Sequence, residues 1–277
     1  MPVSVMLAVL AGAFLHAAWN VSVKAGGDKH LETALLLAGG ALIAVLLLPV
    51  LPRPAIASLP EIGLSVGLHV AYFTLLARAY HAGDMAHLYP LMRGVPPLLL
   101  AVLGPLFGET LAPAHWWGIG LISAGVLSLG LGKGAAGHGR ASLVALLNAG
   151  VIAGYTLNDG IGARLSGAPL SYTLAIFLAT AVVFLGWALF RRGRALFAVP
   201  ARRWGIGLLA AGCSIGSYAL ALWAMTRAPI APVAALRETA ILFGMGLARL
   251  MLRERLGPAR QAAAALILAG AVTLRLL

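Results

Sequence analysis

Long apolar stretches follow one another along the whole chain, separated by short connections that carry glycines, prolines and charges. We predict membrane-spanning helices at 3–23, 31–51, 61–80, 85–107, 114–132, 141–163, 169–190, 204–226, 229–252 and 259–277. Each stretch has roughly the 20 residues that an α-helix needs to cross the hydrocarbon core of a bilayer. Breakers such as Gly26-Gly27-Asp28, Pro113 and Pro200 mark the connections. The pattern predicts an all-α polytopic membrane protein with ten transmembrane helices.

The pattern also repeats once, at an offset of 145 residues. The motif Glu-x-Leu-x-Pro-Ala at 109–114 recurs at 254–259, and Leu-Ile-x-Ala-Gly at 121–125 recurs at 266–270. We therefore divide the chain into a first five-helix repeat (1–133), a linker (134–140) and a second five-helix repeat (141–277). Because five is odd, the second repeat enters the membrane with the opposite polarity. Inverted repeats of this kind surround a central substrate site in many secondary transporters.

Composition excludes a soluble globular protein. Hydrophobic residues make up 61% of the chain, charged residues only 10%, and the mean hydropathy is +0.95. We therefore expect the lipid bilayer to be the solvent of this fold. The net charge of +12 lies mostly in short connections, which favours anionic lipid headgroups over nucleic acid as its partner. The lone Cys213 forms neither an intramolecular disulfide nor a thiolate metal site, and we expect no cofactor.

The basic residues divide unevenly between the two predicted ends of the bundle. Fourteen Lys and Arg belong to the connections after the odd-numbered spans, and four lie at the opposite end. The positive-inside rule places the first group in the cytoplasm and both termini outside.

Two arginines, Arg93 and Arg237, lie well inside apolar runs, where a charge costs about 2.5–3.5 kcal/mol on insertion scales. At the repeat offset Arg93 aligns with Glu238. One reading is a structural salt bridge between Arg93 and Glu238. The other is that Arg93 or Arg237 faces a central cavity and holds an anionic group of a substrate. Both readings apply, one after the other, if the arginine leaves Glu238 and binds the substrate when the substrate arrives.

Backbone features of the spans add two expectations. Pro90, Pro96 and Pro97 remove backbone donors, so the fourth span should be bent and should line a cavity. The glycine pairs Gly63-xxx-Gly67, Gly150-xxx-Gly154 and Gly212-xxx-Gly216 predict close helix packing.

Polar residues on the other spans complete the candidate site. In the first span His16, Asn20 and Lys24 are spaced by four and share one helical stripe, which should face the bundle interior. The candidate substrate-binding residues are Arg93, Arg237, Glu238, Tyr89, Trp19, Asn20, His16, Tyr155, Asn158 and Asp159. A second tier of snorkelling or cavity-wall residues comprises Lys24, His69, Tyr72, Tyr218 and Trp223. Asp159 is the best candidate for a titrating carboxylate after Glu238.

Four short motifs resemble those of a known family. They are His16-Ala-Ala-Trp19-Asn20, Tyr89-Pro-Leu-Met-Arg93-Gly94, Tyr155-Thr-Leu-Asn-Asp159-Gly160 and Leu236-Arg237-Glu238-Thr239. Together with the repeat, they resemble EamA-type members of the drug/metabolite transporter superfamily over essentially the whole chain. The resemblance implies a basket-shaped bundle with a central cavity, alternating access, and export of amino acids or other small metabolites. It also implies cytoplasmic termini, contrary to the charge count, so the orientation stays open.

We predict a secondary active transporter of small polar metabolites such as amino acids or related zwitterions and anions. The family resemblance implies export as the direction of transport. We expect a monomer in the cell inner membrane, with a proton or another coupling ion as an open alternative. An intramembrane enzyme or lipid-handling protein is the second hypothesis, although no span carries a convergent catalytic set. A passive channel is the third, and no ring of pore-lining charges supports it.

Overall fold

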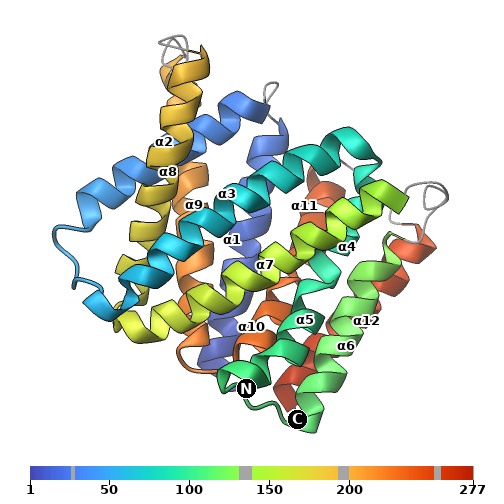
Figure 1. Ribbon diagram of the computed structural model, residues 1–277. Helices are drawn as coiled ribbons and strands as arrows, with labels where there is room; N and C mark the ends of the chain where they lie inside the picture. Colours follow the sequence, from blue (N-terminus) through green and yellow to red (C-terminus); the bar gives the residue numbers. More distant parts are fainter. Residues whose placement is uncertain (26–28, 131–138, 193–199, 253–256, 277) are drawn as a thin grey trace.

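The protein is a bundle of helices, seen in Figure 1 as a computed structural model that describes residues 1–25, 29–130, 139–192, 200–252 and 257–276. The α-helices are α1 (Val3–Ala25), α2 (Lys29–Leu47), α3 (Leu59–Ala82), α4 (Met85–Gly94), α5 (Pro96–Leu103), α6 (Pro113–Ser128), α7 (Gly139–Ser166), α8 (Pro169–Arg192), α9 (Ala201–Met225), α10 (Ile230–Arg237), α11 (Ala240–Leu252) and α12 (Pro258–Leu276). Two 3₁₀ turns, η1 (Ile56–Ser58) and η2 (Gly104–Phe107), complete the helical elements.

Eight stretches in the described ranges are long and apolar enough to cross a bilayer. They are Val3–Asn20, Ile56–Ala79, Met85–Phe107, Gly139–Ser166, Pro169–Gly186, Ala201–Met225, Ile230–Leu247 and Pro258–Leu276. The helices in the other two predicted spans are shorter: the apolar part of α2 is Leu31–Leu47, and α6 has 16 residues, about 24 Å at 1.5 Å per residue. The predicted polytopic, helical membrane protein is thus confirmed, while the number ten stays a prediction. The predicted linker at 134–140 lies mostly outside the described residues.

The predicted bend in the fourth span is a helix break. Helix α4 runs through Pro90 without interruption, and its N-cap Asp84 accepts a hydrogen bond from the Ala86 N–H at 2.8 Å. The break falls at Val95, before two prolines that have no backbone N–H to donate. A second break separates α10 from α11 at Glu238 and Thr239. Both breaks leave an arginine in the last turn of a half-helix, Arg93 in α4 and Arg237 in α10.

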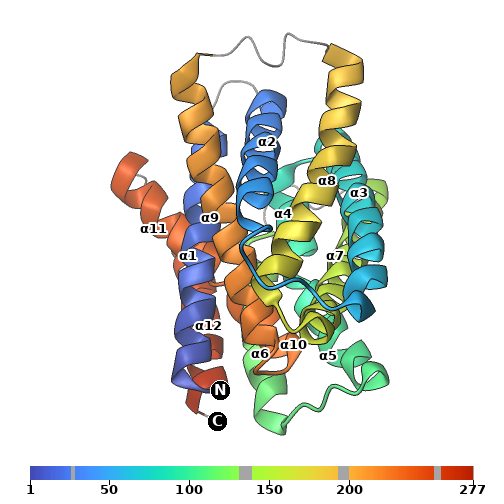
Figure 2. The same cartoon turned by 90° about the vertical axis from the view of Figure 1, so that its left-hand side faces the viewer.

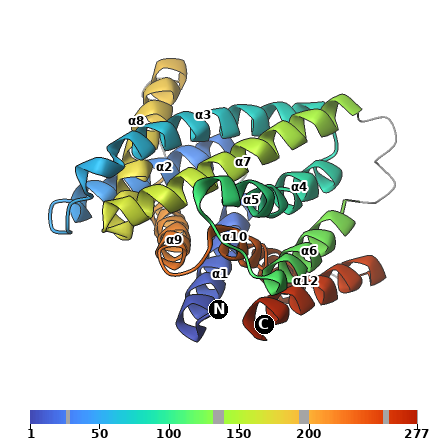
Figure 3. The same ribbon diagram turned by 60° about the horizontal axis from the view of Figure 1, so that its bottom comes forward.

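The helices pack most extensively as four partnerships: α1 with α9, α3 with α7, α2 with α8 and α9, and α6 with α12. Figure 3 shows α6 beside α12 and α3 beside α7. The α6–α12 contact brings backbones together, since a Cβ on Gly118 would lie 3.2 Å from the Gly270 carbonyl oxygen and one on Gly125 would lie 2.8 Å from that of Ala263. The predicted packing face at Gly63 and Gly67 is wrong, because no other segment among the described residues lies within 4 Å of their Cβ positions.

The two ends of the bundle are packed differently. Both termini lie at one end, where α10 packs against α5, α6 and α7 (Figures 1 and 2). The repeat offset makes α4 the counterpart of α10, and α11, α12 and α1 those of α5, α6 and α7. Within the described ranges, α4 has no comparably extensive contact with α11, α12 or α1. Helix α4 packs instead against α6 and α7, so different helix pairs meet at the two ends.

Candidate functional site

An ion pair between the two halves lies at the centre of the site. Arg93 Nε donates to Glu238 Oε2 at 2.9 Å, and the two side chains are 13% and 7% exposed. Both residues lie at helix breaks, and the carbonyl end of a half-helix favours a cation such as Arg93. The contact joins two residues related by the repeat offset. Only one nitrogen of Arg93 and one oxygen of Glu238 have a partner among the described residues.

Arg237 adds a second guanidinium beside this pair. Its central carbon lies 5.2 Å from the centre of the Tyr218 ring, a cation–π geometry. Arg237 makes no hydrogen bond or ion pair with any residue that the structure describes. The site therefore holds two arginines against one nearby glutamate, and one guanidinium fork is open to an anion.

Aromatic side chains form one wall beside the charges. His69 of α3 stacks on Tyr155 of α7 with ring centres 4.5 Å apart, and Tyr72 meets Tyr155 edge to face at 5.9 Å. Tyr218 of α9 joins at 6.3 Å from His69. The structure thus gathers three of the second-tier residues, His69, Tyr72 and Tyr218, around a first-tier one.

The first span contributes less than expected. His16 lies within electrostatic range of Arg93 and Arg237, and its predicted contact with a substrate stays a prediction. Trp19 meets the His16 ring edge to face, with ring centres 5.3 Å apart, and also packs on the cluster of Leu36, Ala210 and Ala211 from α2 and α9. Its buried indole N–H has no acceptor among the described residues. Asn20 Nδ2 donates back to the His16 carbonyl at 2.8 Å.

The remaining three candidates differ from one another in their surroundings. Tyr89, one turn before Arg93, lies within electrostatic range of it and is 39% exposed. Trp223 lies in the last turn of α9 beneath Arg227, whose guanidinium carbon is 4.5 Å from its ring, so this residue belongs to the termini end. The side chain of Lys24 lies outside the described residues.

Asp159 is the hub of a second polar cluster. Its carboxylate is fully buried and accepts hydrogen bonds from Tyr218 at 2.5 Å, from Asn158 at 3.1 Å and from Tyr172 at 3.3 Å. Asn158 also donates to the Glu61 carbonyl at 2.8 Å. Asn158 therefore joins Asp159 to the backbone of α3, and its predicted contact with a substrate stays a prediction.

Sequence reasoning missed a second cross-half ion pair at the termini end. Arg164, near the end of α7, pairs with Glu109 and donates to the carbonyls of Met225 at 2.7 Å and Ala228 at 3.1 Å. Glu109 also accepts from the Ile230 N–H at 2.7 Å. The sequence did contain a signal, because Glu109 is the first residue of the repeated motif. A charged residue at the end of a span, however, is equally consistent with exposure to solvent.

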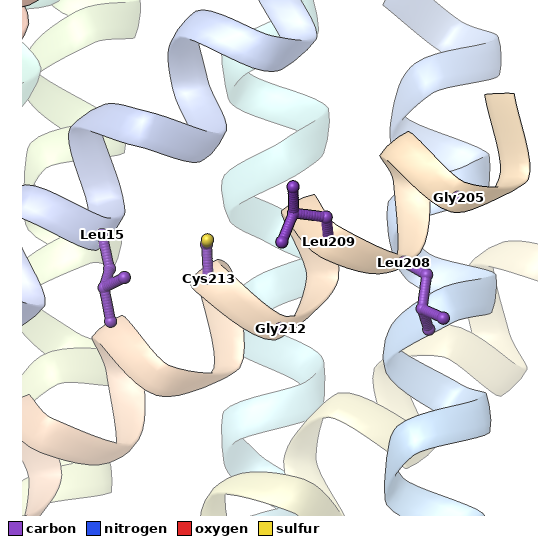
Figure 4. Close-up of a pocket in the computed structure, with 6 residues that line it drawn as sticks. All are labelled: Leu15, Gly205, Leu208, Leu209, Gly212 and Cys213. Atoms are coloured by element: carbon purple, nitrogen blue, oxygen red, sulfur yellow. The ribbon is translucent and has the colours of Figure 1, made fainter. Parts of the chain in front are cut away.

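A separate groove opens between α1 and α9 (Figure 4). Its volume is about 430 Å³, and its lining is Leu15, Gly205, Leu208, Leu209, Gly212 and Cys213. This lining carries no charge, and Leu209 is 70% exposed. The groove is thus distinct from the polar centre, and the predicted central cavity stays a prediction.

Comparison with known proteins agrees with this architecture. Residues 140–276 match the model of the EamA-like transporter family. No curated relative matches the sequence. One similar solved structure, titled only as the crystal structure of a protein, is 22% identical and has a TM-score of 0.74, covering 99% of this chain and 96% of that one. This likeness shows a shared fold. The family match identifies the chain as a member of the EamA-like transporter family, within the drug/metabolite transporter superfamily, and hence as a membrane transporter.

Proposed function

We propose that the protein is a secondary active transporter that exports small polar metabolites, such as amino acids or related zwitterions and anions, across the cell inner membrane. Family membership gives the transporter class and favours transport over an intramembrane enzyme. The family match does not give the substrate, the direction or the mechanism of transport, and these are what we propose. Arg237 carries it, since this guanidinium lies beside the Arg93–Glu238 pair without a hydrogen-bond partner in the described ranges.

The charges at the centre suit a substrate that has a carboxylate. Arg237 and the unused nitrogens of Arg93 offer donors in the planar geometry that carboxylates accept. The unused Glu238 oxygen offers an acceptor for an ammonium group. An amino acid brings both groups, so it satisfies the centre better than a simple anion does.

Helix packing supports alternating access between inverted repeats. The α1–α9 and α3–α7 partnerships are related by the repeat offset, and so are the Gly118–Gly270 and Gly125–Ala263 approaches. Residues on a two-fold axis contact their own counterparts, as Arg93 and Glu238 do. The α10 contacts at the termini end and the α4 contacts are made with different, non-equivalent helices. Exchanging these two packings between the repeats would change which side of the site is open.

Counterflow in liposomes tests this function. Wild-type protein should exchange an internal mixture of unlabelled L-amino acids for labelled ones outside, and a thermal-shift screen then identifies the amino acid that binds. Arg237→Gln should weaken binding by about 10- to 100-fold, because hydrogen bonds to a charged group contribute about 1.5–3 kcal/mol.

Arg53→Gln is the matched control, since Arg53 is exposed in the connection after α2. It should bind and exchange like the wild type. If the Arg237→Gln and Arg93→Ala variants bound the amino acid as tightly as the wild type does, the proposed site would be refuted. Flux of labelled amino acid without exchange for an internal one would favour a channel.

A further inference from the structure

The proposed substrate site leaves one buried carboxylate unused. Asp159 is fully buried on α7, and each of its oxygens accepts a hydrogen bond from a neutral group. No Lys, Arg or His nitrogen in the described part of the chain lies within ion-pair distance of it. An unpaired buried charge is costly, whereas the three donors favour the carboxylate. These opposing effects make it a group that can gain and lose a proton.

The titratable and charged neighbours of Asp159 come from every helix that packs on α7 and has such groups. His69 and Glu61 belong to α3, Tyr172 to α8, Tyr218 to α9 and Arg237 to α10. From α4, Arg93 acts on Tyr155, which shares α7 with Asp159. Helix α5 and the turn η1 contain no titratable residue.

A line of polar groups leads from Asp159 toward the termini end. Glu61, in the first turn of α3, has a buried Oε2 without a hydrogen-bond partner among the described residues. Between them, the Tyr172 hydroxyl and the Glu61 Cβ both press against Gly162, where any Cβ would collide with them. The Tyr172 hydroxyl, which donates to Asp159, therefore lies close to the side chain of Glu61 as well.

Tyr218 connects this line to the substrate site. Its hydroxyl donates to Asp159 and its ring lies beneath the Arg237 guanidinium. We propose that Asp159 binds one proton and releases it in each transport cycle, and that Tyr218 links the charge state of Asp159 to the position of Arg237. The proton comes from water at one end, binds a carboxylate oxygen of Asp159 and leaves to water at the other end. This coupling rests on the proposed transport function.

Infrared difference spectroscopy tests proton binding without a substrate. Between low and high pH, the reconstituted wild type should show a carboxylic acid band that Asp159→Asn lacks. Glu32→Gln should keep the band, because Glu32 is a buried carboxylate already paired with Arg203. A full band in Asp159→Asn overturns the proposal. If that variant fails to fold, Tyr218→Phe serves instead: it should move the midpoint of the titration, and an unchanged midpoint overturns the proposal.

A pH-sensitive dye inside liposomes tests the coupling. A gradient of mixed L-amino acids should drive proton movement through the wild type, while Asp159→Asn should lose at least 10-fold in the number of protons moved per amino acid exchanged. Counterflow without proton movement in the wild type would overturn the coupling alone. Absence of counterflow in the wild type would overturn the proposed function, while the infrared band would still decide whether Asp159 binds a proton.

Discussion

Two of the arginine–glutamate pairs that join the halves of the chain differ in how fully their hydrogen-bonding groups are used. At the termini end, Arg164 donates to Glu109 and to two backbone carbonyls, and Glu109 also accepts from the start of α10. At the centre, Arg93 and Glu238 share a single hydrogen bond. The first network has its partners within the protein, whereas the second keeps donors and an acceptor that a bound molecule can use.

This difference separates a pair that stabilises the fold from a pair that can bind a ligand. A saturated pair loses much when one partner is removed, because the other is left buried and unpaired. Removing one partner of an unsaturated pair lowers the stability of the protein less, but it weakens the binding of a ligand. Substitutions in the Arg164–Glu109 pair should therefore mainly lower stability, whereas substitutions in the Arg93–Glu238 pair should lower stability less and should also weaken ligand binding.

The largest loss of stability is expected at the saturated pair. Arg164→Met leaves Glu109, which is 7% exposed, without its cation and should lower the free energy of unfolding by about 3 kcal/mol. Chemical unfolding in detergent measures this loss. The double variant Arg164→Met with Glu109→Leu should recover part of it. A loss below about 1 kcal/mol in the single variant would contradict the assignment of this pair as the lock of the termini end.

The Arg203–Glu32 pair should give an intermediate loss. It joins the start of α9 to the start of α2, with side chains 34% and 7% exposed, and Arg203 has no further partner among the described residues. Arg203→Met should therefore cost about 2 kcal/mol in the same unfolding measurement. A loss as large as that of Arg164→Met would show that the extra carbonyl contacts of Arg164 contribute little.

At the centre, Glu238→Gln should cost about 2 kcal/mol of stability, because Gln still accepts one hydrogen bond but no longer neutralises the buried Arg93. Its effect on binding identifies the kind of substrate. If Glu238 holds an ammonium group, calorimetric titration should show roughly 10-fold weaker binding of the amino acid but unchanged or tighter binding of its deaminated analogue. Equal weakening for both would contradict a zwitterionic substrate.

The smallest change in stability is expected for Arg237→Gln. Arg237 has only the Tyr218 ring as its partner in the described ranges, so the free energy of unfolding should change by less than about 0.5 kcal/mol. The same preparation should show the weakened binding predicted above. A loss of stability comparable to that of Arg164→Met would mean that Arg237 is a structural residue.

Much of the helical architecture follows from the sequence, because apolar length and proline position are local properties. All ten predicted ranges contain helix, and the fourth breaks beside Pro96 as the missing N–H groups require. The charged residues Arg93, Arg237 and Glu238 could also be recognised in the sequence, since a charge within an apolar run usually faces a partner or a cavity.

Orientation about each helix axis was harder to predict, because neighbouring helices set it. Trp19 lies against the His16 ring and also packs on the cluster that α2 and α9 form, which the spacing along α1 alone does not reveal. The glycine spacing at Gly63 and Gly67 occurs on an unpacked face, whereas Gly118 and Gly125 are spaced by seven and do make contact. The partner of Glu109 comes from another half of the chain, and no local pattern reveals such a distant residue.

The close approach of α6 and α12 has a consequence for how such a chain could arise. Gly118, Gly125 and Gly270 join the last helix of one half to the last helix of the other, and this seam does not depend on the chain being continuous between them. Two separately synthesised fragments, cut between Gly130 and Gly139, would still carry complementary surfaces. A transporter of this shape could therefore have begun as an assembly of two short proteins, with fusion into one polypeptide coming afterwards.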